Sequence, residues 1–268
     1  MKPPALRAGD SGFASTLARG LSLLAAFRPG EIWLSNAELA RRTGLSRPTV
    51  SRLGATLVEL GYLRQAPTSS YRLGARLLGL VRPLLSGMAF RQAARPVMKE
   101  LADYARGAVS IAILEGLEAV FVETSVGPEP HPLAPEIGTA SPLVQTAAGR
   151  ALLSLLDESE LTAKFEDVKR MQPELLKRFG QTTQREIERV RENGYALSLG
   201  DFRQDVHAIG VPLGRTLAGE VLSMNCGIPL YRLRPQNLVS EIAPRVVAAA
   251  NTIRALLALS AGPALNQP

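Results

Sequence analysis

Apolar residues in the first third of the chain recur at the spacing of amphipathic helices. A first helix is predicted over residues 15–27, where four apolar residues lie three or four positions apart: Leu17, Leu21, Leu24 and Phe27. Ser35 followed by Glu38 has the spacing of a capping box, in which each side chain accepts a hydrogen bond from the other residue's backbone N–H group. This pair predicts the start of a second helix, which Gly44 ends.

A third helix is predicted after a very short turn. Ser46 is its expected N-cap, and Pro48 is tolerated in the first turn because the N–H groups there lack intrahelical partners. Gly61 ends this helix, whose apolar stripe consists of Val50, Leu53, Leu57 and Leu60. Residues 62–64 and 71–73 are β-prone and enclose a segment with a proline and three hydroxyl residues, which predicts a hairpin.

The rest of the chain mixes helical and extended patterns. Helices are predicted near residues 74–85 and over 88–105, and a stretch with five prolines, 127–142, is expected at the surface or over a site. The remaining predicted elements are strands 109–114 and 119–126, helices 147–155, 158–165 and 183–193, strands 196–199, 208–212 and 220–225, and a closing helix 236–259. Separate runs of helices and strands predict an α+β protein.

The placement of charge divides the chain into two parts. A chain of 268 residues is expected to form two domains, since a domain commonly has about 100–200 residues. The net charge of +7 lies entirely in residues 1–80, which hold eleven basic and four acidic side chains, whereas the remainder holds 20 of each. This segregation favours a head that binds a polyanion and a neutral body with another task.

Composition also sets the expected surroundings of the protein. No apolar run reaches the roughly 18 residues of a membrane helix, and residues 1–13 lack the apolar core of a secretion signal. The single cysteine, Cys226, excludes an internal disulfide. We therefore expect a cytoplasmic protein without a membrane partner. With one cysteine and two histidines, we expect no metal site.

The second and third predicted helices have the sequence logic of a helix-turn-helix. Ala40 is small where the helices cross, Gly44 permits a left-handed turn, and Val50 faces back toward the first helix of the pair. Together with the hairpin, this pattern predicts a winged helix-turn-helix. We expect double-stranded DNA as its partner, and docking of the same basic head on a protein or RNA is the alternative.

Helix geometry separates the residues expected to read bases from those expected to hold phosphates. At about 100° per residue, one face of the third helix points away from its apolar stripe. The residues expected to face the major groove are Ser46, Arg47, Pro48, Ser51 and Arg52. Of these, Arg52 is the best candidate for reading a guanine. Phosphate contacts are expected from Arg41, Arg42, Arg64 and Arg72. One head buries little surface, so a dimer on a near-palindromic operator is expected.

Residues 36–53 (NAELARRTGLSRPTVSRL) resemble the helix-turn-helix of the isocitrate-lyase-regulator (IclR) family of bacterial transcription factors. Residues 142–153 (PLVQTAAGRALL) resemble the family's signature at a helix of its effector domain. The resemblance spans about residues 13–262. It implies homodimers, which often pair into tetramers on DNA, and an effector that is a small organic molecule.

The resemblance also implies a domain layout and a fold. The implied regions are a tail (1–12), a winged helix-turn-helix (13–74), a linker helix (75–87), an effector-binding and oligomerisation domain (88–262) and a second tail (263–268). The effector domain is expected to be GAF-like, with a curved antiparallel sheet flanked by helices. An effector in this domain would act by binding two dimer geometries unequally.

An effector site follows from the same resemblance. In the family, the effector carboxylate meets backbone amides where the signature helix begins, here at Ala147 and Ala148. The family's other contacts come from three strands, and the corresponding positions here are Leu199 (or its neighbour Ser198), Ala208, Met224 and Cys226. A shift by one residue in the last strand would bring Ser223 and Asn225 inward instead. Because these positions are mostly apolar here, we expect an aromatic or other larger organic acid.

Catalytic motifs of the common hydrolase, phosphate-loop and dinucleotide-binding types do not occur in the sequence. Asp201 and Asp205 lie four positions apart in a predicted loop and are expected to be solvated. We therefore expect a transcriptional regulator that is not an enzyme, with no catalytic residue and no cofactor. A metabolite-binding module or enzyme with a basic docking head is the alternative.

Overall fold

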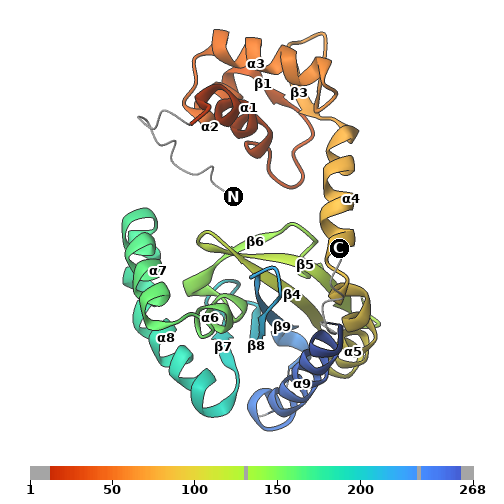
Figure 1. Ribbon diagram of the computed structural model, residues 1–268, viewed down its shortest axis with the longest axis vertical. Coiled ribbons are helices and arrows are strands. Elements are labelled where there is room, and N and C mark those ends of the chain that lie inside the picture. Colours follow the sequence, from red (N-terminus) through yellow and green to blue (C-terminus); the bar gives the residue numbers. More distant parts are fainter. Residues whose placement is uncertain (1–12, 130–131, 234–236, 261–268) are drawn as a thin grey trace, which may run out of the picture. The chain divides into compact units, whose positions relative to one another are not determined.

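The computed structural model describes residues 13–129, 132–233 and 237–260 (Figure 1). The chain divides between Gly87 and Met88 into two compact units, each of which is described by itself. Both units combine helices with an antiparallel sheet, which confirms the α+β class.

The N-terminal unit is a helix-turn-helix with a small sheet. Its described elements are α1 (Ser15–Ala25), β1 (Leu34–Ser35), α2 (Asn36–Thr43), α3 (Arg47–Glu59), β2 (Leu63–Gln65), β3 (Ser70–Leu73), a 3₁₀ turn (Ala75–Leu77) and α4 (Leu78–Gly87). Strand β3 lies between β1 and β2, and all pairs are antiparallel. The core of this unit contains Leu23, Leu34, Leu39, Val50, Leu53, Leu63 and Tyr71.

Two helices of this unit carry apolar side chains that the unit does not bury. In α1 the predicted stripe faces the core only in part: Leu24 and Phe27 pack against the core and Leu23 is buried, whereas Leu17 and Leu21 are exposed. In α4 most large apolar side chains are exposed, among them Leu78, Leu80, Val81 and Leu84. Helix α4 also contains Pro83 in its interior.

The C-terminal unit is built on one antiparallel sheet with the strand order β6-β5-β4-β9-β8-β7. Its described elements are α5 (Phe90–Ala105), β4 (Ala108–Glu115), β5 (Glu118–Val126), β6 (Ala140–Pro142), α6 (Ala147–Leu153), α7 (Glu158–Met171), α8 (Pro173–Asn193), β7 (Ala196–Leu199), β8 (Val206–Arg215), β9 (Val221–Pro229) and α9 (Ala243–Ser260), together with 3₁₀ turns at Leu143–Gln145 and Leu230–Arg232 and a π-helical turn at Leu238–Ile242.

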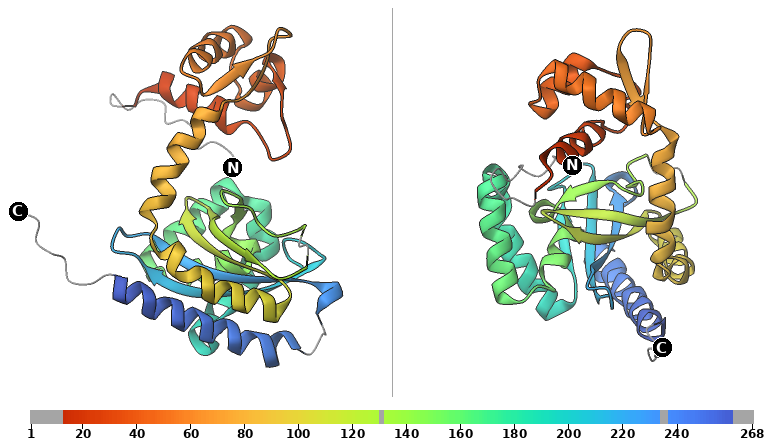
Figure 2. Two further views of the ribbon diagram at one scale, coloured as in Figure 1. Left: turned by 90° about the vertical axis from the view of Figure 1, so that its right-hand side faces the viewer. Right: turned by 45° about the horizontal axis from the view of Figure 1, so that its top comes forward.

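Helices cover both faces of this sheet (Figure 2). Helices α5 and α9 pack on one face, and α6 lies across the other face with α8 beside it. Register shifts at Ile111/Ala112 and at Pro212/Gly214 disturb the ladders of β4 and β8. Such irregularities bend strands. The curved antiparallel sheet flanked by helices is the expected architecture.

The predicted elements of the body were found, with clear differences at α7, α8 and β6; α7 continues six residues past its predicted end at residue 165. Helix α8 begins at Pro173, ten residues before the predicted start, because a proline is well tolerated in the first turn and the polar segment after it remains helical. The short strand β6 was not predicted, since three residues carry no period and this strand is defined only by its pairing with β5.

Candidate functional sites

The turn between α2 and α3 is fixed by caps and one left-handed residue. The Ser35 hydroxyl accepts a hydrogen bond from the Glu38 N–H group (3.1 Å), and Ser46 accepts one from Thr49 (3.4 Å). Gly44 has a φ of 71°, a conformation that is strained for a residue with a Cβ atom, and its N–H group donates to the Ala40 carbonyl at 2.9 Å. The local sequence therefore positions α3 as expected.

The outer face of α3 presents most of the residues expected to contact bases. Ser46, Arg47, Pro48 and Arg52 are exposed, while Val50 and Leu53 on the opposite side are buried. Ser51 is also exposed, but its hydroxyl accepts a hydrogen bond from the Asn36 amide (2.8 Å), which ties α2 to α3. Ser51 therefore supports the turn as well as facing outward.

Arg42, one of the arginines expected to hold a phosphate, is engaged in ion pairs within the N-terminal unit. Arg42 pairs with Glu31 (2.5 Å) and Glu38 (2.6 Å), donates to the Ala26 carbonyl, and is only 13% exposed. Hydrogen bonds from Arg42 lower the pKa of Glu31 to about 2, and those from Arg41 and Arg42 lower the pKa of Glu38 to about 2. The expected phosphate role does not fit Arg42, because its guanidinium is committed to joining α2 to the segment after α1.

Glu38 shows why the predicted capping box is only half formed. Its carboxylate accepts bonds from Arg41 and Arg42 instead of from the backbone of Ser35. Arg41 nevertheless remains 69% exposed. Two of its N–H groups donate to Glu38, so Arg41 differs from Arg42 in its exposure to solvent and not in lacking a carboxylate partner.

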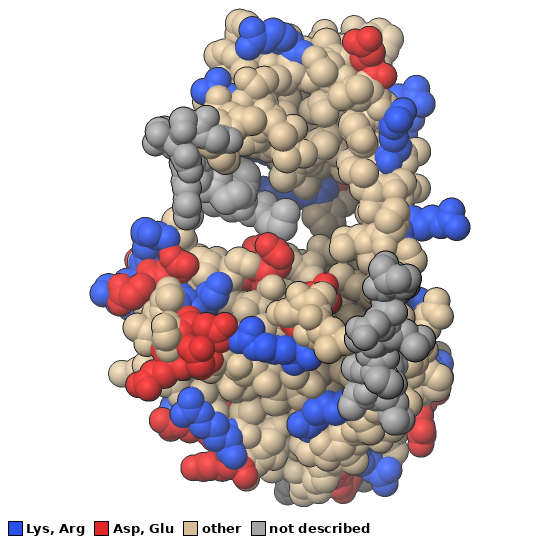
Figure 3. Space-filling model, viewed as in Figure 1, with Lys and Arg blue, Asp and Glu red and all other residues tan. Residues whose placement is uncertain are grey.

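The other four predicted DNA-contacting arginines carry no ion pair within the described residues: Arg47, Arg52, Arg64 and Arg72. Arg64 and Arg72 are directly opposite each other on β2 and β3, and both are exposed. On the face shown in Figure 3, basic side chains of the N-terminal unit have few acidic neighbours, whereas both signs mix over the other unit. An exposed cluster of cations without carboxylates is suited to binding a polyanion.

In the C-terminal unit, two of the predicted effector residues, Ala147 and Ala148, lie at the start of α6, where this helix packs on the sheet. A side chain at Gly210 of β8 would come within 2.0 Å of the Ala147 carbonyl oxygen, so helix and strand touch by their backbones. The Ser223 hydroxyl of β9 donates to the Ala148 carbonyl at 3.1 Å. The Thr146 side chain accepts from the Gly149 N–H group at 3.1 Å and caps α6.

Strand alternation places three of the predicted effector residues on the face of the sheet that points away from α6. Ser223 faces α6, so Met224 points to the opposite face, Asn225 back toward α6, and Cys226 away again. Leu199 likewise alternates with Ser198, whose hydroxyl donates to the Gln145 carbonyl at 3.4 Å. The predicted contacts of Leu199, Met224 and Cys226 are therefore inconsistent with a site beside α6. Burial raises the pKa of the Cys226 thiol to about 12, so this side chain is neutral.

A row of small and polar residues crosses the sheet on the α6 face. Gly210 pairs with Asn225, Asn225 with Ser110, and Ser110 with Thr124. The hydroxyl groups of Ser110 and Thr124 are 3.0 Å apart, and Thr124 also donates to the Pro135 carbonyl. The Asn225 amide is 9% exposed and has no hydrogen-bond partner within the described residues. Ala208, two residues from Gly210 on β8, shares this face.

A buried arginine near this row has no counterpart in the sequence-based expectations. Arg150 of α6 is fully buried, donates to the carbonyls of Val144 and Leu197, and pairs with Asp201 at 2.7 Å. Asp201 is thus not the solvated residue that was expected. The single arginine in the otherwise apolar sequence of α6 was a usable signal, because a charge in a buried helix requires a partner.

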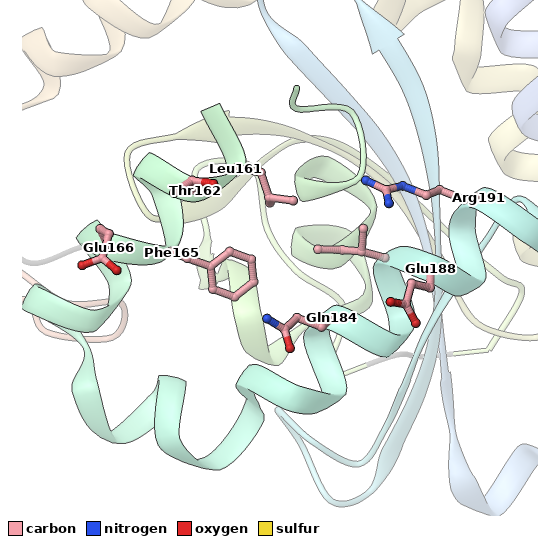
Figure 4. A pocket seen from close by; sticks show the side chains of 8 residues that line it. Leu161, Thr162, Phe165, Glu166, Gln184, Glu188 and Arg191 are labelled. Carbon is pink, nitrogen blue, oxygen red and sulfur yellow. The ribbon is translucent and has the colours of Figure 1, made fainter. Parts of the chain in front are cut away.

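A surface groove of about 490 Å³ lies elsewhere in this unit, between α7 and α8. Leu161 and Phe165 of α7 point toward α8 across it (Figure 4). None of the predicted effector residues lines this groove. Within the described part of the chain, no group of three or more potential metal ligands occurs, and no helix is long and apolar enough to cross a membrane.

Comparisons with known proteins match both units to one family. Residues 83–255 match the model described as bacterial transcriptional regulator IclR C-terminal, and residues 16–67 match the IclR helix-turn-helix domain. The chain is 32% identical over 222 residues to the HTH-type transcriptional regulator TsaQ1/TsaQ2 of Comamonas testosteroni, covering 79% of this chain and 78% of that protein.

Two further relatives cover nearly the whole chain. The p-hydroxybenzoate hydroxylase transcriptional activator of Acinetobacter baylyi is 29% identical over 253 residues, which are 91% of this chain and 92% of that protein. Among solved structures, an IclR family transcriptional regulator from Brucella abortus has a TM-score of 0.84 and 37% identity, and the match covers 96% of this chain and 98% of that one.

Proposed function

Because the chain belongs to the IclR family of bacterial transcriptional regulators, it is an effector-modulated DNA-binding regulator and not an enzyme, and we propose here which surfaces perform each task. The N-terminal domain binds DNA and the C-terminal domain binds a small-molecule effector. We place its action in the cytoplasm, where bacterial operator DNA lies.

One observation carries the proposed DNA interface: the arginines on the outer faces of α3 and the wing lack carboxylate partners within the described residues. Arg52 is proposed to read a base edge in the major groove, and Arg47 at the start of α3 contacts a base or a phosphate. Arg41, Arg64 and Arg72 contact phosphates and set the register without reading sequence. Ser46, Pro48 and Ser51 are proposed to face the DNA on the same side as Arg52. Arg42 is left out because its guanidinium pairs with Glu31 and Glu38.

A homodimer is proposed from the two exposed apolar helix faces of the N-terminal unit. In α1 the side chains of Leu17 and Leu21 lie one turn apart and are both exposed. In α4 the large apolar side chains occupy one side of the helix, and Gly79, Ser86 and Arg82 occupy the other. Uncharged faces of this kind favour an identical partner, because a twofold pair also matches a near-palindromic operator. Pairing of two dimers remains compatible with this arrangement.

The proposed effector site lies on the α6 face of the sheet and combines Ala147, Ala148 and Ala208 with Ser110, Ser223 and Asn225. The Asn225 amide supports this position, because it has no hydrogen-bond partner within the described residues and so can bind a ligand group. Phe121 and Ala112 are buried on the same side of the sheet. We propose an aromatic carboxylic acid, whose ring would lie on these apolar side chains. A relative named for activating p-hydroxybenzoate hydroxylase is consistent with this class.

The proposal is tested by selecting tight-binding duplexes from a random pool and measuring their affinity by fluorescence anisotropy. Arg52→Ala should lose most of the preference for the selected over a scrambled duplex, whereas Arg72→Ala should weaken binding to both equally. Arg170→Ala, an exposed arginine of α7, is the matched control and should change neither. Failure of the unaltered protein to prefer any duplex would contradict the proposal.

A further inference from the structure

The chain's single tryptophan, Trp33, lies at the edge of the three-stranded sheet formed by β1, β3 and β2, and is 45% exposed. It directly precedes β1, in which Leu34 pairs with Tyr71, so Trp33 lies beside Arg72 of β3. The guanidinium carbon of Arg72 is 5.5 Å from the centroid of the Trp33 ring. This is the distance of a cation–π contact, and tryptophan is the best aromatic partner for one.

Arg72 lies directly opposite another positive charge on the sheet, which is electrostatically unfavourable. Its direct cross-strand neighbour is Arg64, and like charges facing each other on a sheet destabilise the pair. Within the described residues neither guanidinium has a carboxylate partner. The row Trp33, Arg72 and Arg64 therefore presents two uncompensated cations on the exposed face of the sheet, with an aromatic ring at one end.

We infer that Trp33 is a positioning residue that holds the Arg72 guanidinium ready for a DNA phosphate. This inference rests on the proposed DNA-binding function and adds a residue that the sequence did not single out. A ring that stacks on the flat side of a guanidinium limits its rotamers but leaves the N–H donors at its rim free. A carboxylate partner would occupy those same donors, as Glu31 and Glu38 do for Arg42. The cation–π contact therefore orients Arg72 without consuming its capacity to bind an anion.

The test measures binding to a duplex of arbitrary sequence, about 30 base pairs long, because phosphate contacts do not depend on sequence. Trp33→Leu should weaken binding by roughly 2- to 5-fold, the equivalent of an exposed cation–π contact, and Trp33→Phe should restore part of the loss. Ile32→Ala is the matched control, since Ile32 is the neighbouring exposed apolar residue and should change nothing. Each variant's thermal unfolding is followed by circular dichroism.

A double-mutant cycle separates positioning from a general structural effect. If Trp33 acts through Arg72, adding Trp33→Leu to Arg72→Ala should cause no further loss, and Arg72→Ala alone should shift the fluorescence emission of Trp33. Additive losses, or unchanged binding by Trp33→Leu, would overturn the inference while leaving DNA binding intact. If the unaltered protein binds no duplex at all, the proposed function itself fails. Should Trp33→Leu not fold, the Trp33→Phe variant and the emission shift still decide the matter.

Discussion

Arginines in the two units differ in burial and in whether they pair with a carboxylate. In the C-terminal unit, Arg150 is fully buried and paired with Asp201, and Arg91 pairs with buried Glu123 at 2.9 Å. In the N-terminal unit, Arg52 and Arg72 are exposed and have no carboxylate partner within the described residues. We interpret the buried, carboxylate-paired guanidinium groups as structural and propose the exposed, unpaired ones for DNA recognition; Arg41, which is exposed but paired with Glu38, lies between these two cases. Arg42 differs from the other arginines of the basic unit, because it is mostly buried and pairs with Glu31 and Glu38, as the buried arginines pair with their carboxylates.

The largest effect is expected from Arg150→Ala. This change removes the partner of Asp201 and the Arg150 donor to the Leu197 carbonyl, while the Val144 carbonyl keeps its bond from Thr183, and breaking a buried ion pair costs about 3–5 kcal/mol. Urea unfolding should therefore show a correspondingly lower free energy of unfolding. Arg170→Ala, which removes an exposed arginine, is the control and should change stability by less than about 0.5 kcal/mol. Equal stability of both variants would show that the buried pair has no structural role.

Arg52 and Arg42 offer a direct comparison within the N-terminal unit. Arg52→Ala should reduce discrimination between the selected operator and a scrambled duplex by about 1–3 kcal/mol, without lowering the thermal midpoint. Arg42→Ala should instead lower the thermal midpoint, because Glu31 and Glu38 lose their shared partner. Anisotropy and calorimetric scans on the same samples measure both quantities. An Arg42 variant of normal stability that binds all duplexes less tightly would restore the phosphate role expected from sequence.

A smaller effect is expected at the two faces of β9. Asn225→Leu removes the unpartnered amide on the α6 face and should weaken binding of the effector acid by roughly 2- to 10-fold, the worth of a single hydrogen bond. Cys226→Ala alters the opposite face and should leave effector affinity unchanged. Calorimetric titration with 4-hydroxybenzoate as the first probe compares the two variants. The reverse outcome would mean that effectors bind on the α5 and α9 side of the sheet.

The smallest effect concerns how the ion pairs of Arg42 with Glu31 and Glu38 make the stability of the N-terminal unit sensitive to acid. Because the pKa values of Glu31 and Glu38 are lowered from 4.5 to about 2, their ion pairs stabilise the folded unit fully above pH 4.5. That stabilisation is lost as the pH falls from about 4.5 to 2. Thermal midpoints measured over this range should decline more steeply for the unaltered protein than for Arg42→Ala. Parallel pH profiles would indicate that these pairs do not contribute.

Local signals explain why the helix-turn-helix could be predicted in detail from sequence. Ser35, Gly44 and Ser46 act on groups within four residues of themselves, so their caps and turn are found as expected. The half-formed capping box is the exception, because Glu38 is drawn to arginines one turn later.

Long-range pairing explains what could not be predicted. Strand β9 is buried on both faces, so its alternation of apolar and polar residues does not reveal which side faces α6. A shift of one residue there separates Met224 and Cys226, the positions expected from the resemblance, from Ser223 and Asn225, the alternative that faces α6. The pairing of Arg150 with Asp201 joins residues 51 positions apart, a contact that no local pattern encodes.

Pro83 gives the connection between the two units a mechanical property. A proline inside a helix has no N–H group to donate, so the Gly79 carbonyl, four residues earlier, lacks its usual intrahelical donor. Most sharp helix bends occur at such positions. Helix α4, with which the N-terminal unit ends, therefore bends at lower cost near Gly79 and Pro83 than elsewhere along its length.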